Sequence, residues 1–336
     1  MALLRSCLCL AAGLSLLGGA ARCDSTPLSA IAARPTERTF TYKTVGTLPI
    51  RADVRLPVGS SAGPHPVLMW IHGGALMFGS RMGLPPFAPD LEAAGFVIVS
   101  IDYRLAPESR LPDILDDVTD AYAWICEKGP ELFGADPHRV AVAGGSAGGY
   151  LTLTLGYRAH PRPAALVSFW GYGDIIGPWY SEPSPYSRHN AYKIARENAY
   201  RQVSGPPIAQ ERDRKGNGQT FYVYCRQQGL WPRAVTGWNP HREPEKFFPY
   251  MPLRNVTPEY PPTLLIHGDS DTDVPYEQSV MMAAELKRNG VDHVFIGVPG
   301  AEHGLDHAEP KTIASVDRRA VAFIREHLEG TDGYQR

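Results

Sequence analysis

The feature that most constrains the fold is a regular alternation of short apolar runs with longer segments of helical periodicity. Residues 67–71 (VLMWI) and 96–101 (FVIVSI) contain almost no polar position, which is typical of strands buried on both faces of a parallel sheet. Between residues 111 and 128, apolar side chains recur at helical spacing instead. The alternation predicts an α/β fold, with a mostly parallel central sheet covered by helices on both faces.

The same patterns place the remaining elements. Further buried strands are predicted at residues 140–143, 165–170, 263–267 and 293–298. Further helices are predicted at residues 150–158, 276–289 and 311–328. Near the N-terminus, residues 40–45 and 50–56 alternate apolar and polar side chains, which predicts antiparallel strands at one edge of the sheet.

One long interval, residues 174–262, breaks this rhythm. It contains no buried strand pattern, many prolines and aromatic residues, and two helical segments at residues 191–203 and 220–228. Because a structureless loop of this length is unusual inside a compact domain, we expect a cap over one end of the sheet. The core then comprises residues 24–173 and 263–336.

The first 23 residues have the pattern of a secretory signal peptide, with Arg5 followed by an apolar run and then small residues. The apolar run is shorter than the about 20 residues that span a bilayer, so we expect a secreted or periplasmic protein without stable membrane insertion. A lipid anchor on Cys23 is the disfavoured alternative, because Arg22 precedes it. The other two cysteines beyond the signal, Cys126 and Cys225, are too few for a disulfide framework, although one bridge between them stays open.

Charge and composition narrow the class of partner. The net charge is -2 and no long block of like charge occurs, which argues against a nucleic-acid partner or an anionic membrane. We therefore expect a small-molecule substrate. The sequence does not indicate the oligomeric state.

The segment VAVAGGSAGGY, residues 140–150, places Ser146 in a G-x-S-x-G pattern between a predicted strand and a predicted helix. This is the context of a nucleophile elbow, a sharp turn that exposes a reactive serine. The alternative is a tight turn with a helix-capping serine, and the flanking elements favour the nucleophile. Such a serine needs a general base and an acid that orients the base.

Candidates for both partners lie downstream. His303 lies in a Gly-flanked loop directly after the last predicted strand, so it can reach over the carboxyl edge of the sheet as the base. The acid is one of Asp269, Asp271 and Asp273, which follow the strand at residues 263–267, and their spacing does not choose among them.

The negative oxygen of an acyl-transfer intermediate needs preorganised N–H donors, each worth about 2.7 to 4 kcal/mol. The backbone N–H of Ala147 is one candidate. Gly73, Gly74 and Ala75 directly follow the predicted strand at residues 67–71 and are the others. The alternative is a tight turn in which His72 is structural.

Five motifs now support a family resemblance: HGGA at residues 72–75, DYRLAPE at 102–108, GGSAGG at 144–149, HGDSDTDVP at 267–275 and EHG at 302–304. In their order and spacing, the chain resembles α/β-hydrolase carboxylesterases of the hormone-sensitive-lipase-like group. The resemblance implies the α/β-hydrolase fold and ester hydrolysis without a cofactor or a metal. It also implies these roles: nucleophile Ser146, base His303, acid Asp271, and oxyanion amides of Gly74, Ala75 and Ala147. Asp102 and Arg104 would brace the loops around the site.

Two positions depart from the group. Many members have an acidic residue where this chain has Gly145, and Ala75 replaces the third glycine of the HGGG motif.

From the motifs together, we expect a serine esterase that works through an acyl-enzyme, with an amide- or peptide-cleaving hydrolase as the alternative. A catalytically inactive binding protein is disfavoured, because every catalytic role keeps a candidate residue. Cap aromatics are expected to line the substrate pocket or to pack the cap: Trp179, Tyr180, Phe221, Tyr222, Trp231 and Trp238.

Overall fold

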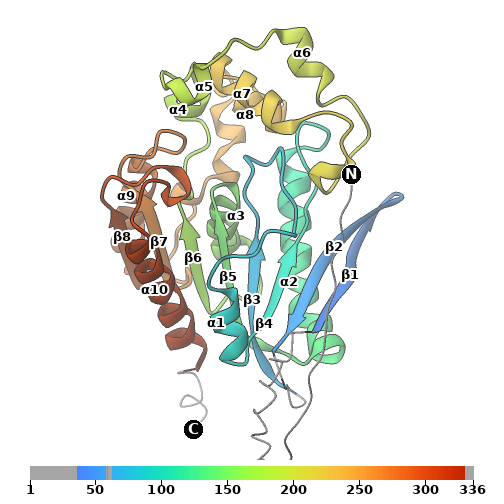
Figure 1. The fold of residues 1–336 in the computed structure, drawn as a ribbon, viewed down its shortest axis with the longest axis vertical. Coiled ribbons are helices and arrows are strands. Elements are labelled where there is room, and N and C mark those ends of the chain that lie inside the picture. Colours follow the sequence, from blue (N-terminus) through green and yellow to red (C-terminus); the bar gives the residue numbers. More distant parts are fainter. Residues whose placement is uncertain (1–35, 58, 60–62, 330–336) are drawn as a thin grey trace, which may run out of the picture. The chain divides into compact units, whose positions relative to one another are not determined.

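A single eight-stranded sheet forms the centre of the protein, in the order β1-β2-β4-β3-β5-β6-β7-β8 (Figure 1). The computed structural model describes residues 36–57, 59 and 63–329, so the predicted signal peptide lies outside the described residues. The strands are β1 Thr36–Val45, β2 Leu48–Leu56, β3 His65–Ile71, β4 Val97–Ile101, β5 Ala135–Gly145, β6 Ala165–Phe169, β7 Thr263–Gly268 and β8 His293–Val298. Strand β2 pairs antiparallel with β1 and β4, and the other pairs are parallel, which confirms the predicted mostly parallel sheet.

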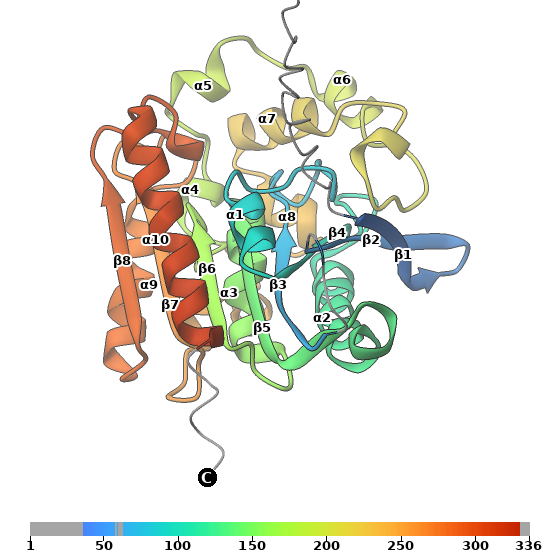
Figure 2. The ribbon, with the colours of Figure 1, turned by 60° about the horizontal axis from the view of Figure 1, so that its bottom comes forward.

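Helices cover both faces of this sheet (Figures 1 and 2). On one face lie α2 Leu111–Phe133, α3 Ala147–Arg158 and α9 Glu277–Arg288, and on the other lie α1 Ala88–Ala93 and α10 Pro310–Glu329. Successive strand side chains point to opposite faces, so Met69 packs with α2 and α3 while Leu68 packs with α1 and α10. Two cores need apolar residues at every strand position, which explains the continuous runs. In the described part of the chain, no helix is both long enough and apolar enough to cross a membrane.

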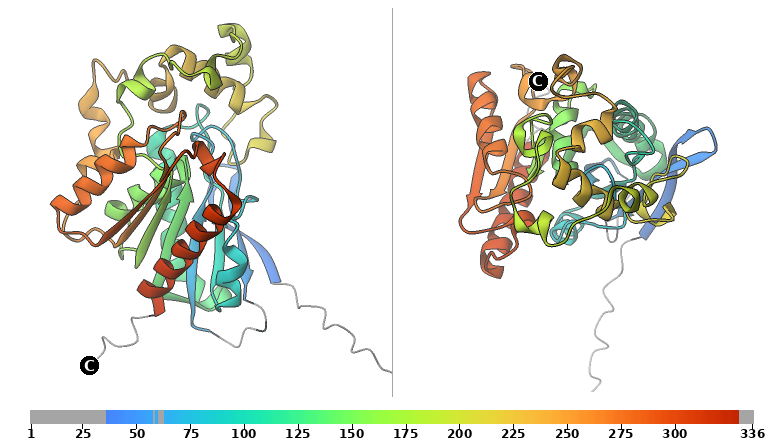
Figure 3. Two further views of the ribbon diagram at one scale, coloured as in Figure 1. Left: turned by 60° about the vertical axis from the view of Figure 1, so that its left-hand side comes forward. Right: turned by 90° about the horizontal axis from the view of Figure 1, so that it is seen from above.

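The interval 174–262 contains no strand and supplies helices above the carboxyl end of the sheet (Figures 1 and 3). Its α-helices are α4 Pro178–Ser181, α5 Ser187–Asn190, α6 Arg196–Arg201, α7 Gly218–Gln228 and α8 Trp231–Thr236. Short 3-10 turns complete it: η1 Glu211–Asp213, η2 Pro244–Lys246, η3 Phe248–Tyr250 and η4 Pro252–Arg254, followed after β8 by η5 His303–Leu305. Turn η4 contacts α3 and α9, so this interval also returns along one face of the sheet.

Some sequence expectations differ from the structure. Strand β8 was expected to be buried on both faces, yet most of its residues are half-buried, because it pairs only with β7 at the edge of the sheet. Helices α1, α4, α5 and α8 were not predicted. The open possibility of a disulfide is also settled, because Cys126 and Cys225 are both free thiols.

Candidate active site

Ser146 lies in a strained turn between β5 and α3, with φ 57° and ψ −119°. Glycines make this turn possible, because a Cβ on Gly148 would stand 2.0 Å from the carbonyl oxygen of Ile71, and one on Gly144 would stand 2.7 Å from the same oxygen. The Ser146 N–H donates to the carbonyl of Phe169 at 2.9 Å and holds the turn against β6. Strain at one partly buried serine between a strand and a helix is the geometry of a nucleophile elbow.

Three strand ends bring a hydrogen-bonded chain of side chains together. The Nε2 atom of His303 lies 3.1 Å from Ser146 Oγ, and its Nδ1 atom lies 2.7 Å from Asp271 Oδ2. The other Asp271 oxygen accepts the backbone N–H groups of Asp273 and Val274, each at 2.8 Å. An ionised carboxylate only accepts hydrogen bonds, so Nδ1 carries a proton and Nε2 is left to accept the Ser146 hydroxyl.

The three candidate aspartates have different surroundings. Asp269 accepts the Gly300 N–H at 2.7 Å and contacts no catalytic candidate through its side chain in the described contacts. Asp271 is the one that holds His303 Nδ1. Asp273 faces the other ring nitrogen, with its Oδ2 atom 3.8 Å from His303 Nε2.

Burial and charge set the protonation of this chain. Burial alone would raise the pKa of Asp271, but hydrogen bonds from His267 and His303 lower it to about 2. Burial would lower the pKa of His303, but the hydrogen bond to Asp271 and the charges of Asp273 and Asp271 raise it above its ordinary value. The carboxylates are therefore anionic at neutral pH and favour the charged form of the imidazole.

Asp273 belongs to a buried cluster that the sequence analysis did not find. Its Oδ1 atom lies 2.7 Å from Arg226 Nη1 and 2.9 Å from His189 Nε2, and it accepts the Tyr222 hydroxyl. Burial would raise the Asp273 pKa, but His189, His303 and Arg226 hold it well below its usual range. Arg226 and Tyr222 come from α7 and His189 from α5, outside every motif, so no local sequence pattern connects them with the site.

The turn after β3 lies beside the nucleophile. A Cβ on Gly73 would stand 3.3 Å from Ser146 Cβ, and Gly74 turns the chain with φ 101°. Ala147 opens α3, whose first N–H groups have no partner within the helix. The structure thus brings Gly73 and Ala147 next to Ser146, while Gly74 and Ala75 continue the same turn.

His72 fixes the orientation of this turn. Burial lowers the His72 pKa to about 4, so the ring is neutral, and its Nδ1 atom lies 2.7 Å from the Gly73 carbonyl oxygen. The Tyr103 hydroxyl donates to the carbonyls of His72 at 2.9 Å and Gly73 at 3.3 Å. Because C=O and N–H point in opposite directions across a trans peptide, anchoring the Gly73 carbonyl also fixes the direction of the Gly74 N–H.

Buried ion pairs brace the neighbouring loops. The Asp102 carboxylate accepts the Arg81 backbone N–H at 2.9 Å and its guanidinium at 2.6 Å. The Arg104 guanidinium makes two hydrogen bonds to Asp117, at 2.7 and 2.9 Å. The DYRLAPE motif therefore acts through these contacts as a structural brace, as the resemblance implied.

Gly145 faces an aromatic side chain. A Cβ at this position would stand 3.3 Å from Trp170 Nε1, and the Trp170 ring lies 6.2 Å from the His303 ring, centre to centre. Trp170 also lines an apolar pocket of about 160 Å³, together with Trp70, Phe87 and Phe169. A second, more open hollow of about 420 Å³ exposes Gly73 and Gly74 and shares Trp70 and Leu84 with the first.

The cap aromatics do not line either of these two hollows as the described residues form them. Trp179, Tyr180 and Trp231 form a stack, with ring centres 3.6 and 3.9 Å apart. The Trp231 Nε1 atom donates to the Ala75 carbonyl at 3.0 Å, which ties the cap to the oxyanion turn. Of the two expectations for these residues, the structure therefore favours packing.

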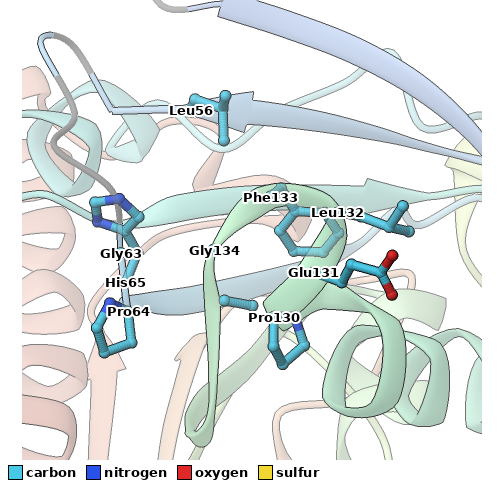
Figure 4. Close-up of a pocket in the computed structure, with 10 residues that line it drawn as sticks. Leu56, Gly63, Pro64, His65, Pro130, Glu131, Leu132, Phe133 and Gly134 are labelled. Atoms are coloured by element: carbon cyan, nitrogen blue, oxygen red, sulfur yellow. The ribbon is translucent and has the colours of Figure 1, made fainter.

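A separate hollow of about 500 Å³ lies at the opposite end of the sheet, around the start of β3 and the end of α2 (Figure 4). Its described lining includes Glu131 and His65 but neither serine nor cysteine. Among the residues that the structure describes, no group of three His, Cys, Asp or Glu side chains is placed to hold a metal ion. Ser146 and its neighbours are therefore the strongest candidate site.

Comparisons with known proteins find an esterase and large synthases among the relatives of this chain. Esterase LipC of Mycobacterium tuberculosis is 31% identical over 277 residues, which cover 78% of this chain and 61% of LipC. The non-reducing polyketide synthase Preu6 of Preussia isomera is 29% identical over 307 residues, which cover 80% of this chain but only 14% of the synthase. The chain thus spans a small part of such synthases.

Solved structures show the same fold. The structure of EstE1, a thermostable carboxylesterase cloned from a metagenomic library, matches with a TM-score of 0.64 at 23% identity, over 88% of this chain and 92% of EstE1. A protein of unknown function from Staphylococcus aureus matches with a TM-score of 0.68 at 22% identity, over 87% of this chain and 99% of that one. A family model of the alpha/beta hydrolase fold matches residues 68–307. Since that match covers most of the chain, the protein belongs to the α/β-hydrolase family.

Proposed function

We propose that this protein is a serine esterase that cleaves small-molecule carboxylic esters through an acyl-enzyme. The observation that carries the proposal is the hydrogen-bonded chain from Ser146 through His303 to Asp271, with distances of 3.1 and 2.7 Å. The similarity to LipC, whose name identifies it as an esterase, supports the same reaction class.

In the proposed reaction, Ser146 Oγ attacks the ester carbonyl carbon while His303 Nε2 takes the hydroxyl proton. The amides of Gly74, Ala75 and Ala147 stabilise the oxygen that becomes negative. His303 then gives its proton to the leaving alcohol, and the acyl group stays on Ser146. Water, deprotonated by the same imidazole, releases the carboxylic acid and restores the serine.

The apolar pocket beside Trp170 supports a small hydrophobic group on the substrate. Its volume is about 160 Å³. Apolar cavities of about 150 Å³ hold a benzene molecule, so a group of similar size fits. We therefore expect esters with short or single-ring groups to react faster than esters of long-chain acids.

The decisive experiment measures hydrolysis of p-nitrophenyl esters of graded acyl length by the wild type and by Ser146→Ala. We expect kcat to fall by roughly 10⁴- to 10⁶-fold in the variant, because the nucleophile is lost. A fluorophosphonate probe should phosphonylate Ser146 of the wild type, with release of fluoride, and should not label Ser146→Ala. Ser187→Ala, an exposed serine of the cap, is the matched control and should behave as the wild type. Undiminished turnover by Ser146→Ala would contradict the mechanism, and cleavage of amides alone would replace the esterase by an amidase.

A further inference from the structure

A hollow of about 520 Å³ lies among α6, α7, α8 and the segment before α2, away from the catalytic residues (Figure 2 shows α6 and α7 side by side). Three exposed arginines line it: Arg110, Arg196 and Arg233. None of its described lining residues is acidic. Three like charges around one hollow repel one another, and an anion bound among them would relieve that repulsion.

Nearby carboxylates have partners outside the hollow. Asp113 accepts the backbone N–H of Arg110 at 3.2 Å and lies 3.4 Å from the Arg104 guanidinium. Glu243 lies 2.5 Å from the Lys246 ammonium group, and the charge of Arg233 also acts on it. Glu197, the neighbour of Arg196 on α6, does not line the hollow. Three positively charged side chains and no negatively charged one therefore line the hollow.

Two of the arginines are held in place. The Arg110 Nη1 atom donates to the Ala234 carbonyl at 2.7 Å, and the Arg196 guanidinium lies 5.1 Å above the centre of the Tyr200 ring. Fixed guanidinium groups lose less side-chain entropy when they bind, and their planar shape suits the two oxygens of a carboxylate.

The floor of the hollow is aromatic. Phe221 and Tyr224 are buried, while Tyr200 stands half-exposed at the rim with its ring centre 5.3 Å from that of Phe221. A bare inorganic anion would leave most of a 520 Å³ hollow unfilled. We propose that this site, the arginine pocket, binds a carboxylate carried on an aromatic body, with the ring on Tyr200, Phe221 and Tyr224 and the carboxylate among the arginines.

Helix α7 separates the arginine pocket from the catalytic site. Phe221 and Tyr224 point to the pocket, whereas Tyr222 and Arg226 contact Asp273. Binding in the pocket therefore needs neither Ser146 nor an ester, and it stands independently of the proposed esterase activity.

The test is isothermal titration calorimetry of the full chain with 2-naphthoate. It compares the untreated wild type with the wild type phosphonylated at Ser146. We expect the same Kd in both forms. Arg196→Gln and Arg233→Gln should each weaken binding about tenfold, because each removes a hydrogen-bonding charge. Arg242→Gln, an exposed arginine outside the pocket, is the matched control and should leave the Kd unchanged.

Three further results decide the ligand class. The neutral analogue 2-naphthylmethanol should bind at least tenfold more weakly, and inorganic phosphate should not compete with naphthoate at equal concentration. Circular dichroism spectra equal to that of the wild type check that the arginine variants are folded. Absence of naphthoate binding, equal affinity in the arginine variants, loss of binding on phosphonylation, or phosphate binding as tight as naphthoate would each overturn the proposal.

Discussion

Two carboxylates lie near the imidazole of His303, one beside each ring nitrogen. Spacing left Asp269, Asp271 and Asp273 equivalent, because all three follow the same strand, and only the family resemblance selected Asp271. The structure separates them by direction: Asp271 meets His303 Nδ1, and Asp273 lies 3.8 Å from Nε2. Side-chain direction in a loop depends on tertiary contacts, here with Arg226 and His189 of the cap, which no local pattern encodes.

The position before the nucleophile, Gly145, also depends on a neighbour that is distant in sequence. Many members of the resembled group have an acidic residue at this position. In the structure the space beside it belongs to Trp170, whose Nε1 atom would lie 3.3 Å from any Cβ there. A side chain at this position would need the indole to shift by a few tenths of an ångström. The departure from the family pattern therefore concerns a pair of positions, 145 and 170, and only one of them lies in a motif.

Asp273 leads to a prediction about the pH dependence of the reaction. Burial lowers the His303 pKa, but Asp271 and Asp273 together raise it above its ordinary value, and a general base works only when it is neutral. The acidic limb of kcat/KM should therefore lie above the ordinary pKa of histidine. In Asp273→Asn the lost charge lowers the pKa of His303, so the limb should move to lower pH.

The measurement is the pH profile of kcat/KM for p-nitrophenyl acetate. Asp269→Asn is the matched control and should keep the wild-type profile, since its side chain accepts from Gly300 and Ser270. Asp271→Asn should instead lower kcat by about 10⁴-fold, because the imidazole loses the partner that fixes its tautomer. An unchanged limb in Asp273→Asn would show that the second carboxylate does not act on the base.

At the scale of elements, the sequence predicted the strands and helices with a long apolar pattern and missed four short helices. The strands of the parallel sheet and helices α2, α9 and α10 have long apolar patterns, and the structure confirms them. Helices α1, α4, α5 and α8 have only four to six residues, too few for a helical period to stand out. Strand β8 is apolar enough for burial on both faces, and its edge position depends on the order of strands, which its own residues do not specify.

The Tyr103 hydroxyl connects the segments that follow β3 and β4, and this contact leads to a prediction about kcat. Tyr103 follows β4 and donates to the carbonyls of His72 and Gly73 after β3. In Tyr103→Phe the oxyanion turn loses that anchor and buried carbonyls lose a donor. We expect kcat to fall about tenfold with KM nearly unchanged, because the Gly74 amide acts on the transition state.

Steady-state kinetics with p-nitrophenyl acetate measure kcat and KM of Tyr103→Phe. Tyr122→Phe is the matched control. Tyr122 is a buried tyrosine of α2, remote from the oxyanion turn in sequence, and should keep kcat. An increase in KM alone would assign Tyr103 to substrate binding rather than to orientation of the turn.

At the scale of the whole molecule, cap and core share one hydrophobic interior. Trp231 and Phe221 of the cap belong to the same buried cluster as Met69 and Ile71 of the sheet. A buried ion pair joins them again: Arg214 of the cap lies 2.6 Å from Glu108, and each side chain is 3% exposed. Arg214 also donates to the carbonyls of Met77 and Ala106, so the cap holds the segment that follows the oxyanion turn.

The ion pair between Arg214 and Glu108 leads to a prediction about how the protein unfolds. Because cap and core share their interior, urea should unfold the wild type in a single transition. Arg214→Met leaves the Glu108 carboxylate buried without its partner, which should lower the free energy of unfolding by about 3 to 5 kcal/mol. The double variant Glu108→Gln with Arg214→Met should recover part of that loss, because no uncompensated charge remains.

The matched control is Arg212→Met, which changes an exposed residue of the same turn and should unfold like the wild type. Two separate transitions in the wild type, followed by fluorescence and by proteolysis of the cap, would mean that the cap is an independent unit. An unchanged free energy of unfolding in Arg214→Met would mean that this ion pair does not bind the cap to the core.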